Sequence, residues 1–153
     1  MMRRILPLVV AGAVFGMAGY AAAQGNAEAA VEKRQAEMKK LGGGFKAILD
    51  YVKDGVGTPA DVQKAAATVK AQAEIVPTLF PAGTALGVGK SAALPALWER
   101  KAEVDKISAQ MKVDADKLVQ AAATGDKAQI GAAFQAVGKN CQGCHQDFRQ
   151  KKE

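Results

Sequence analysis

The chain has 153 residues, of which 24% are charged and 5% aromatic, and its formal net charge is +6. This positive charge is mild and scattered, which excludes the clustered basic and aromatic patch typical of nucleic-acid binding and allows attraction to acidic partners. The chain contains only two cysteines, which stand together in one motif and leave none for a structural disulfide framework.

The N-terminus has the pattern of an export signal. Met1 to Arg4 is basic, residues 5–20 are apolar and rich in Gly and Ala, and Ala21 to Ala23 forms an A-x-A cleavage site. We predict that residues 1–23 are a signal peptide and that residues 24–153 form one periplasmic domain. The alternative is an uncleaved membrane anchor, which the polar residues after Ala23 disfavour. No other apolar stretch is long enough to span a bilayer, so stable membrane insertion after cleavage is not expected.

The first two predicted helices cover residues 26–52 and about 58–76. The first shows apolar residues at 3- and 4-residue intervals, interrupted by Gly42-Gly43-Gly44, where each glycine costs about 1 kcal/mol of helix propensity. We expect either a local kink there or a close approach of a backbone or a flat ring. The second helix has Thr58 as N-cap, Pro59 at its first position and Asp61 in its first turn.

A long connection rich in Gly and Pro, from residue 77 to about 95, precedes a third predicted helix at about 95–123. Such a crossover is compatible with a helical bundle whose other loops are short. Trp98, on this helix, is expected to pack as a large side chain in the hydrophobic core of the bundle. Gly125 then ends the helix, and Asp126 with Gln129 predicts a capping box at the start of the fourth.

The fourth helix carries the motif Cys141-Gln142-Gly143-Cys144-His145. Residues three and four positions apart share a helix face, so both thiols and the imidazole lie together. This spacing is the signature of c-type haem attachment. Cys141 and Cys144 can add across the two vinyl groups of one haem, and His145 can reach the iron as an axial ligand.

Three other interpretations of the motif compete with haem attachment. A structural zinc site needs four ligands, and the chain has only these two cysteines and one histidine. A thioredoxin-like redox motif expects a βαβ setting, whereas the surrounding pattern is helical. A disulfide between the two cysteines remains possible and would leave His145 unexplained. The sequence therefore favours one haem c, bound covalently through two thioethers.

The attachment residues continue the apolar stripe of the fourth helix, which begins with Ile130 and ends with Phe148. The haem is then expected inside the bundle, against the other helices. The predicted fold class is all-α, an antiparallel four-helix bundle with covalently bound haem c.

Several further segments resemble the cytochrome c′ family, the class II cytochromes c, over nearly the whole predicted domain. They are Arg34-Gln35 with Met38, residues 80–84, Leu97-Trp98, Gly125-Asp126, and residues 137–139 leading into Cys141 and on to Phe148-Arg149. The resemblance implies that Met38 faces the distal side of the iron, that Arg34 lies near the haem propionates and that Arg149 lies beside His145. It also implies a homodimer through the first two helices.

Each of these implied roles has an ordinary structural alternative. A methionine on an apolar helix face usually fills the core. Arg34 and Arg149 could be solvated charges on helix faces. The apolar positions of the first two helices could belong to the core of a monomer.

Two functions are compatible with these residues. The first is a periplasmic, low-spin, one-electron carrier that serves redox partner proteins and uses His145 and Met38 as axial ligands, because a thioether favours ferrous iron. The second is a five-coordinate haem protein in which Met38 only crowds the distal face and nitric oxide or carbon monoxide binds there. No group of residues supplies an acid, a base or a nucleophile, so we do not expect an enzyme, and a peroxidase would need a distal His or Arg pair.

Overall fold

The structure, a computed structural model, describes the backbone of residues 15–151 and the side chains of residues 24–151. The predicted signal peptide, residues 1–23, lies outside the residues whose side chains are described, and its cleavage remains a prediction. Among the described helices, none combines the length and the apolar composition needed to cross a membrane.

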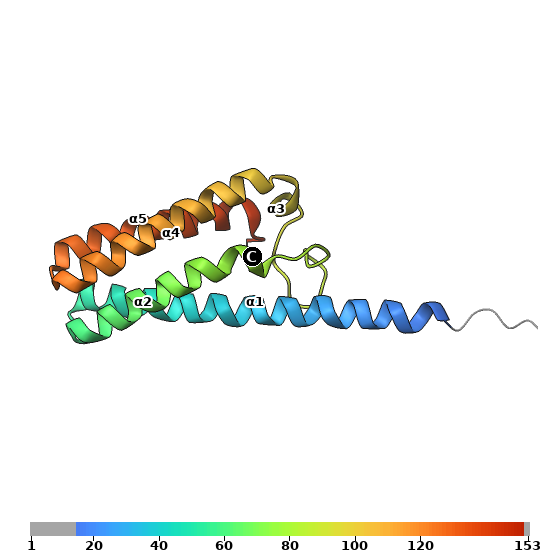
Figure 1. Cartoon of the computed structure of the whole chain (residues 1–153), viewed down its shortest axis with the longest axis horizontal. Helices are drawn as coiled ribbons and strands as arrows, with labels where there is room; N and C mark the ends of the chain where they lie inside the picture. The colour runs from blue at the N-terminus through green and yellow to red at the C-terminus, as the bar shows by residue number, and fades with distance from the viewer. Residues whose placement is uncertain (1–14, 152–153) are drawn as a thin grey trace, which may run out of the picture.

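Four long helices form an antiparallel bundle, as the sequence predicted (Figure 1). They are α1 (Phe15–Asp54), α2 (Pro59–Ile75), α4 (Lys101–Thr124) and α5 (Lys127–Phe148). Two short elements, η1 (Val76–Leu79) and α3 (Ala96–Glu99), flank the connection formed by residues 80–95. Around the bundle α1 packs on α2, α2 on α4, α4 on α5 and α5 on α1. The N-terminal part of α1 extends beyond the other helices (Figure 1).

The start of α2 is capped as predicted. The Thr58 hydroxyl accepts a hydrogen bond from the backbone N–H of Asp61, and the Asp61 carboxylate accepts from the backbone N–H of Thr58. Pro59 occupies the first turn, where its missing N–H needs no partner. These reciprocal bonds set where the second helix begins.

Gly125 ends α4 in the left-handed conformation, with φ of 71°, as expected for a residue without a Cβ. The capping box predicted at the start of α5 is only partly correct. The Asp126 carboxylate accepts from the backbone N–H of Ala128 and Gln129, but the Gln129 side chain donates to that carboxylate and leaves the Asp126 N–H to the hydroxyl of Thr124.

The first helix runs unbroken through Gly42-Gly43-Gly44, without the local kink that was one alternative. The other alternative, close approach of a backbone, is confirmed at Gly44, where an added Cβ would lie 3.2 Å from the carbonyl oxygen of Ala65. The third helix differs from the sequence prediction. The third helix is split at Arg100, whose φ of −106° and ψ of 41° leave the helical region. The break places the Arg100 guanidinium over the Phe148 ring, 5.0 Å from its centroid.

The hydrophobic core has two parts. The larger part joins all four long helices and includes the fully buried Ile48, Leu118 and Ile130. The smaller part lies where α3 and α4 meet the end of α5, and Phe148, 1% exposed, is its largest side chain. Met38 and Cys141 border the first part, and Cys144 borders the second. The attachment helix therefore bridges the two parts of the core.

Trp98 is only half-buried, at the edge of the smaller part of the core, so the expectation that it fills the core is only partly correct. Its indole Nε1 donates a hydrogen bond to the carbonyl oxygen of Phe80 at 3.1 Å. It thus fastens the connection of residues 80–95 to α3.

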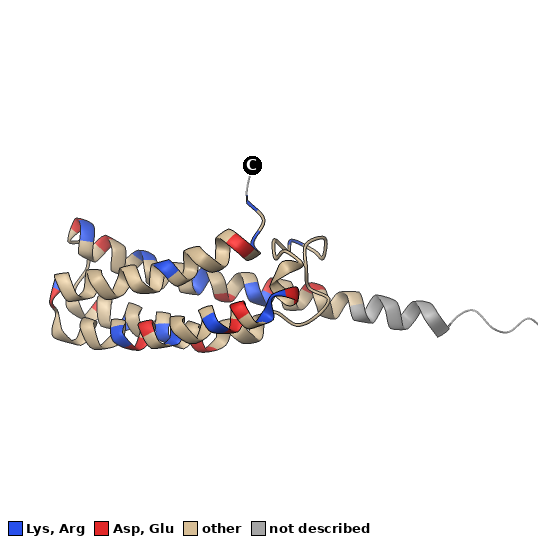
Figure 2. Cartoon of the chain, turned by 90° about the horizontal axis from the view of Figure 1, so that it is seen from above, with Lys and Arg blue, Asp and Glu red and all other residues tan. Residues whose placement is uncertain are grey.

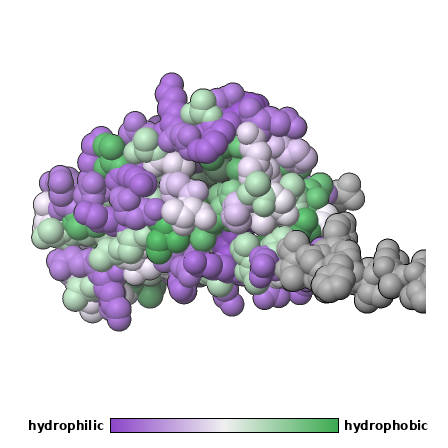
Figure 3. Space-filling model, turned by 45° about the vertical axis from the view of Figure 1, so that its right-hand side comes forward, coloured by the Kyte–Doolittle hydropathy of each residue, from purple (hydrophilic) through white to green (hydrophobic). Residues whose placement is uncertain are grey.

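The charged residues are distributed along the long helices, with both signs interspersed (Figure 2). On the face drawn in Figure 3, apolar surface occurs in small separate areas between hydrophilic side chains. Lysine and aspartate pairs along the helices, such as Lys101 with Asp105, account for part of this pattern. Exposed pairs of this kind contribute little to stability.

Candidate haem site

A cavity of about 620 Å³ opens between α1, α4, α5 and the connection of residues 80–95. Its walls are largely apolar, and the larger apolar side chains include Met38, Leu41, Phe45, Ile107, Met111 and Phe148. A cavity of this volume is in the range of cofactor and ligand sites. All six residues that the sequence singled out, Arg34, Met38, Cys141, Cys144, His145 and Arg149, line it.

Cys141 and Cys144 lie on the cavity side of α5, and both thiols are free and half-buried. Burial raises the pKa of the Cys141 thiol above its usual value. Burial also raises the pKa of Cys144, and the nearby Cys141 and Asp147 add to the effect. Both sulfurs are therefore protonated at neutral pH and are presented to the same cavity.

His145 follows Cys144 on α5 and also lines the cavity, although its side chain is more exposed than either thiol. Partial burial lowers the pKa of His145, and the positive charge of Arg149 lowers it further. The imidazole is therefore neutral at pH 7, which is the form that binds metals.

Arg149 is held by backbone contacts beyond the end of α5. It pairs with Ala93 in an isolated antiparallel bridge, in which Leu94 N–H donates to the Phe148 carbonyl at 2.9 Å and Gln150 N–H to the Ala92 carbonyl at 2.8 Å. The bridge keeps Arg149 close enough to His145 to affect its pKa.

Arg34 is buried, with 5% of its surface exposed, and is therefore not the solvated charge that the sequence left as an alternative. Its guanidinium donates to the hydroxyl and carbonyl oxygens of Thr84 and to the Ser91 hydroxyl, at 2.8 to 3.0 Å, and lies 4.9 Å from the centroid of the Phe80 ring. No carboxylate of the described residues pairs with it. A buried positive charge beside the cavity thus lacks an anionic partner.

The rim of the cavity is basic. Lys39, Lys90, Arg34 and Arg149 line it, and no acidic residue of the described part of the chain does. Gln35 crosses the rim and donates from Nε2 to the carbonyl oxygen of Lys90 at 2.6 Å. An anionic group at this rim would be stabilised by these charges.

Met38 lies on the cavity face of α1, half-buried against the larger part of the core. Gly42, one turn further along α1, also lines the cavity, and a Cβ added there would have no atom within 4 Å. Glycine leaves that wall free of a side chain, and the approach of a flat ring to the glycine segment stays a prediction.

The residues present fit a covalently bound haem. Two thiols and an imidazole on one helix face the cavity, the walls are apolar, and the buried Arg34 has no carboxylate partner, which suits a haem propionate. Sequence reasoning included Thr84 only as part of residues 80–84 and missed Ser91. It did not predict that either residue holds Arg34, because hydroxyl residues in a loop carry no signal of their own. It also missed Asn140, which lines the cavity beside Cys141.

The sequence model of the family described as Cytochrome C′ matches residues 29–149, most of the chain. This chain belongs to the cytochrome c′ family. A cytochrome c′ of Pararhodospirillum photometricum is 41% identical over 124 residues, covering 80% of this chain and 98% of that protein. As a member of the family, the chain carries one covalently attached haem c.

Solved structures of the cytochrome c′ family share this fold. One, a cytochrome c′ with ligand-controlled dimer dissociation, is 30% identical and has a TM-score of 0.76, covering 82% of this chain and 97% of its own. The cytochrome c′ of Alcaligenes xylosoxidans, 27% identical with the same coverage, has been solved as a ferrous variant with bound nitric oxide (TM-score 0.74) and as another variant with carbon monoxide (TM-score 0.73).

These similarities correct the leading functional interpretation of the sequence. A low-spin electron carrier with His145 and Met38 as axial ligands is wrong, because the matched family and the solved neighbours are cytochromes c′, and they agree with the five-coordinate alternative. Met38 lines the cavity.

Proposed function

We propose that this protein binds nitric oxide or carbon monoxide at a five-coordinate haem. His145 is the single axial ligand from the protein, and Cys141 and Cys144 form the two thioethers. The observation that carries the proposal is the set of side chains opposite the attachment helix: Met38, Leu41 and Phe45 from α1 are apolar, so a small uncharged ligand there meets apolar surface.

The haem iron supplies the bond to the gas, and the protein controls what reaches it. Apolar walls disfavour charged or strongly hydrated ligands, because these would lose hydration without gaining a partner. Met38 limits the size of what can bind. Arg34 and the basic rim have the charge to hold the propionates.

The proposed function is binding and not turnover. The cavity wall carries one imidazole, that of His145, which is assigned to the iron, and its arginines stand at the rim or in the bonds to Thr84 and Ser91. We further propose a periplasmic location, after removal of residues 1–23. The family relationship supports it, because haem c is attached outside the cytoplasm.

We also propose a homodimer through α1 and α2, by analogy with the neighbour whose dimer dissociates under ligand control. Size-exclusion chromatography of the haem-loaded protein at several concentrations tests this, with and without carbon monoxide. Elution as a monomer at all concentrations would exclude the dimer.

A visible spectrum of the purified haem-loaded protein tests the proposed function. We expect high-spin bands in both oxidation states and, in the ferrous protein, a large spectral change on adding carbon monoxide. Low-spin bands with a sulfur-to-iron charge-transfer band in the oxidised protein would show that Met38 is a ligand and contradict the proposal.

Met38→Ala provides a second test with an independent readout. The variant should remain high-spin, since no iron bond is lost, and should bind carbon monoxide about tenfold more tightly, because removing a bulky side chain relieves about 1.4 kcal/mol of crowding. Leu49→Ala is the control, because Leu49 is an exposed apolar residue of α1 that does not line the cavity. The affinity of the Leu49→Ala variant for carbon monoxide should not change.

A further inference from the structure

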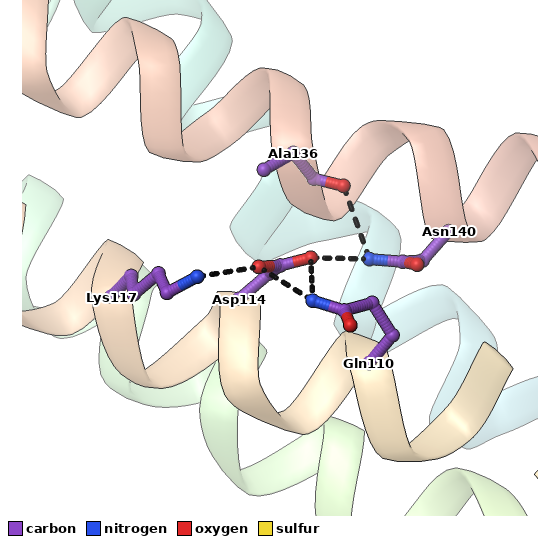
Figure 4. A network of polar contacts seen from close by, with 5 residues as sticks. All are labelled: Gln110, Asp114, Lys117, Ala136 and Asn140. Carbon is purple, nitrogen blue, oxygen red and sulfur yellow. Dashed lines mark hydrogen bonds and ion pairs between the residues drawn. The ribbon is translucent and has the colours of Figure 1, made fainter. Parts of the chain in front are cut away.

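The carboxylate of Asp114 is buried in the middle of α4, facing α5 (Figure 4). Its residue is 7% exposed, and it stands on the inner stripe between Met111 and Leu118. Burying a carboxylate is unfavourable unless hydrogen bonds and an opposite charge compensate it. An apolar residue would be the simpler choice at this position.

The partners of Asp114 are mostly neutral. Gln110 donates from Nε2 to both carboxylate oxygens at 3.1 Å, and Asn140 donates from Nδ2 to one oxygen at 2.9 Å. Among the described residues the only cation paired with it is Lys117, whose Nζ lies 3.4 Å away and whose side chain is 62% exposed. The negative charge is therefore held by amide groups and only weakly neutralised.

Asn140 has one defined orientation. Its Nδ2 also donates to the carbonyl oxygen of Ala136 at 3.1 Å. A carboxylate and a carbonyl can only accept, so the nitrogen of the amide must face both of them. Figure 4 shows the oxygen of Asn140 on the side away from Asp114. No group of the described residues donates to this oxygen.

Asn140 connects this network to the haem site. It lines the cavity and immediately precedes Cys141, the first attachment residue. Met111, one turn before Asp114 on α4, lines the same cavity. Asp114 itself does not line the cavity, but it accepts a hydrogen bond from Asn140, which does.

We propose that Asp114 is a positioning residue for the haem, which acts through Asn140 and favours the ferric state. It fixes the amide so that the oxygen end is left without a hydrogen bond at the cavity wall, beside Cys141. A carboxylate and an amide oxygen both stabilise positive charge, and the ferric centre carries one positive charge more than the ferrous centre.

The protonation state of Asp114 agrees with this role. Burial acts to raise its pKa, but the hydrogen bonds from Asn140, Gln110 and Lys117 outweigh burial and hold the pKa below the usual value. The carboxylate is therefore charged at neutral pH. The inference needs only the covalently attached haem and holds whether or not a gas binds.

Asp114→Asn tests the proposal in the haem-loaded protein. In a spectroelectrochemical titration at neutral pH without added gas, we expect the ferrous-to-ferric ratio at a fixed applied potential to rise about tenfold, equivalent to about 59 mV for one electron. Mass spectrometry first establishes that each variant carries its haem. Lower thermal stability with an unchanged potential would mean a purely structural role and would overturn the proposal.

Asp105→Asn is the matched control. Asp105 is also on α4 and also pairs with a lysine, Lys101, but it is exposed and does not line the cavity. The same loss of charge at this solvated position should change the ratio less than about twofold because solvent and salt screen it. An equal change in both variants would overturn the proposal.

Asn140→Leu tests whether the effect passes through Asn140. Alone it should raise the ferrous-to-ferric ratio, in the same direction as Asp114→Asn, because the amide oxygen is lost. Asp114→Asn should then have a smaller effect in the Asn140→Leu background than in the original protein. An unchanged potential in Asn140→Leu, or an equal effect of Asp114→Asn in both backgrounds, would overturn the proposal. If Asp114→Asn does not fold, the potential of the Asn140→Leu variant alone still tests the proposal.

Discussion

The guanidinium of Arg34 donates to both the hydroxyl and the carbonyl oxygen of Thr84, each at 3.0 Å, across fifty positions of sequence. Thr84 is 1% exposed, and its hydroxyl in turn donates to the carbonyl oxygen of Pro81. One arginine of α1 thus fastens the connection of residues 80–95 at the edge of the haem cavity.

Replacing Arg34 should loosen this connection. Arg34→Met retains the apolar part of the side chain but removes its hydrogen bonds to Thr84 and Ser91, and we expect the free energy of unfolding to fall by about 3 kcal/mol. Urea unfolding of the haem-loaded protein measures the change. Lys33→Met, at an exposed neighbour on α1, should change stability by less than about 0.5 kcal/mol. Similar losses in both variants would contradict the assigned role of Arg34.

Two adjacent glycines of α1 should respond oppositely to alanine. Gly43→Ala places its methyl group where no atom lies within 4 Å, so it should stabilise the protein by about 0.8 kcal/mol through helix propensity. In Gly44→Ala the methyl group would lie 3.2 Å from the Ala65 backbone oxygen, which cannot easily move, and we expect a net loss of about 1 kcal/mol. Thermal unfolding compares the two variants. A gain in both would mean that α1 and α2 are not in close contact at Gly44.

Each thioether bond should be removable by replacing its cysteine, without loss of the other bond. In Cys141→Ala the remaining link through Cys144 should keep the haem on the polypeptide during acid–acetone extraction. The reduced pyridine haemochrome band should move to longer wavelength, because one vinyl group is left unsaturated. With both cysteines replaced by alanine, extraction should remove all haem. Haem retained by the double variant would contradict attachment at Cys141 and Cys144.

Asp126 should make the protein sensitive to acid. Hydrogen bonds from the backbone of Gln129 and Ala128, and from the Gln129 side chain, hold the pKa of Asp126 below its usual value. Because the native pKa is the lower one, this stabilisation is complete above the unfolded value of about 3.9 and is lost as the pH falls through the native value. Asp126→Asn should retain the helix cap while reducing the loss of stability below about pH 4. Identical acid unfolding of both proteins would exclude this role of Asp126.

Local rules predicted much of the fold because the relevant residues are near one another in sequence. Thr58, Pro59 and Asp61 determine the start of α2, and Gly125 determines the end of α4, with no contribution from distant parts of the chain. The spacing of Cys141, Cys144 and His145 likewise placed three groups on one helix face. The resemblance to the cytochrome c′ family added Arg34, Met38 and Arg149, which all line the same cavity.

What the sequence could not provide depends on contacts between distant segments. The break at Arg100 accompanies the approach of its guanidinium to Phe148 on α5, and the continuity of α1 through Gly44 depends on α2. The burial of Asp114 depends on a hydrogen bond from Asn140 of α5, which the sequence of α4 does not reveal. The prediction that Met38 is an axial ligand was wrong because a methionine on an apolar helix face has the same sequence pattern whether it binds iron or only packs.

The antiparallel bridge between Ala93 and Arg149 has a consequence for the order of folding. The helix pairs α1 with α2 and α4 with α5 can form through contacts that are close in sequence, which is fast, whereas this bridge must bring together two segments separated by α3, α4 and α5. We therefore expect the mouth of the cavity to close late on the folding pathway. In hydrogen exchange, the amides of Leu94 and Gln150 should lose protection before those of the four long helices.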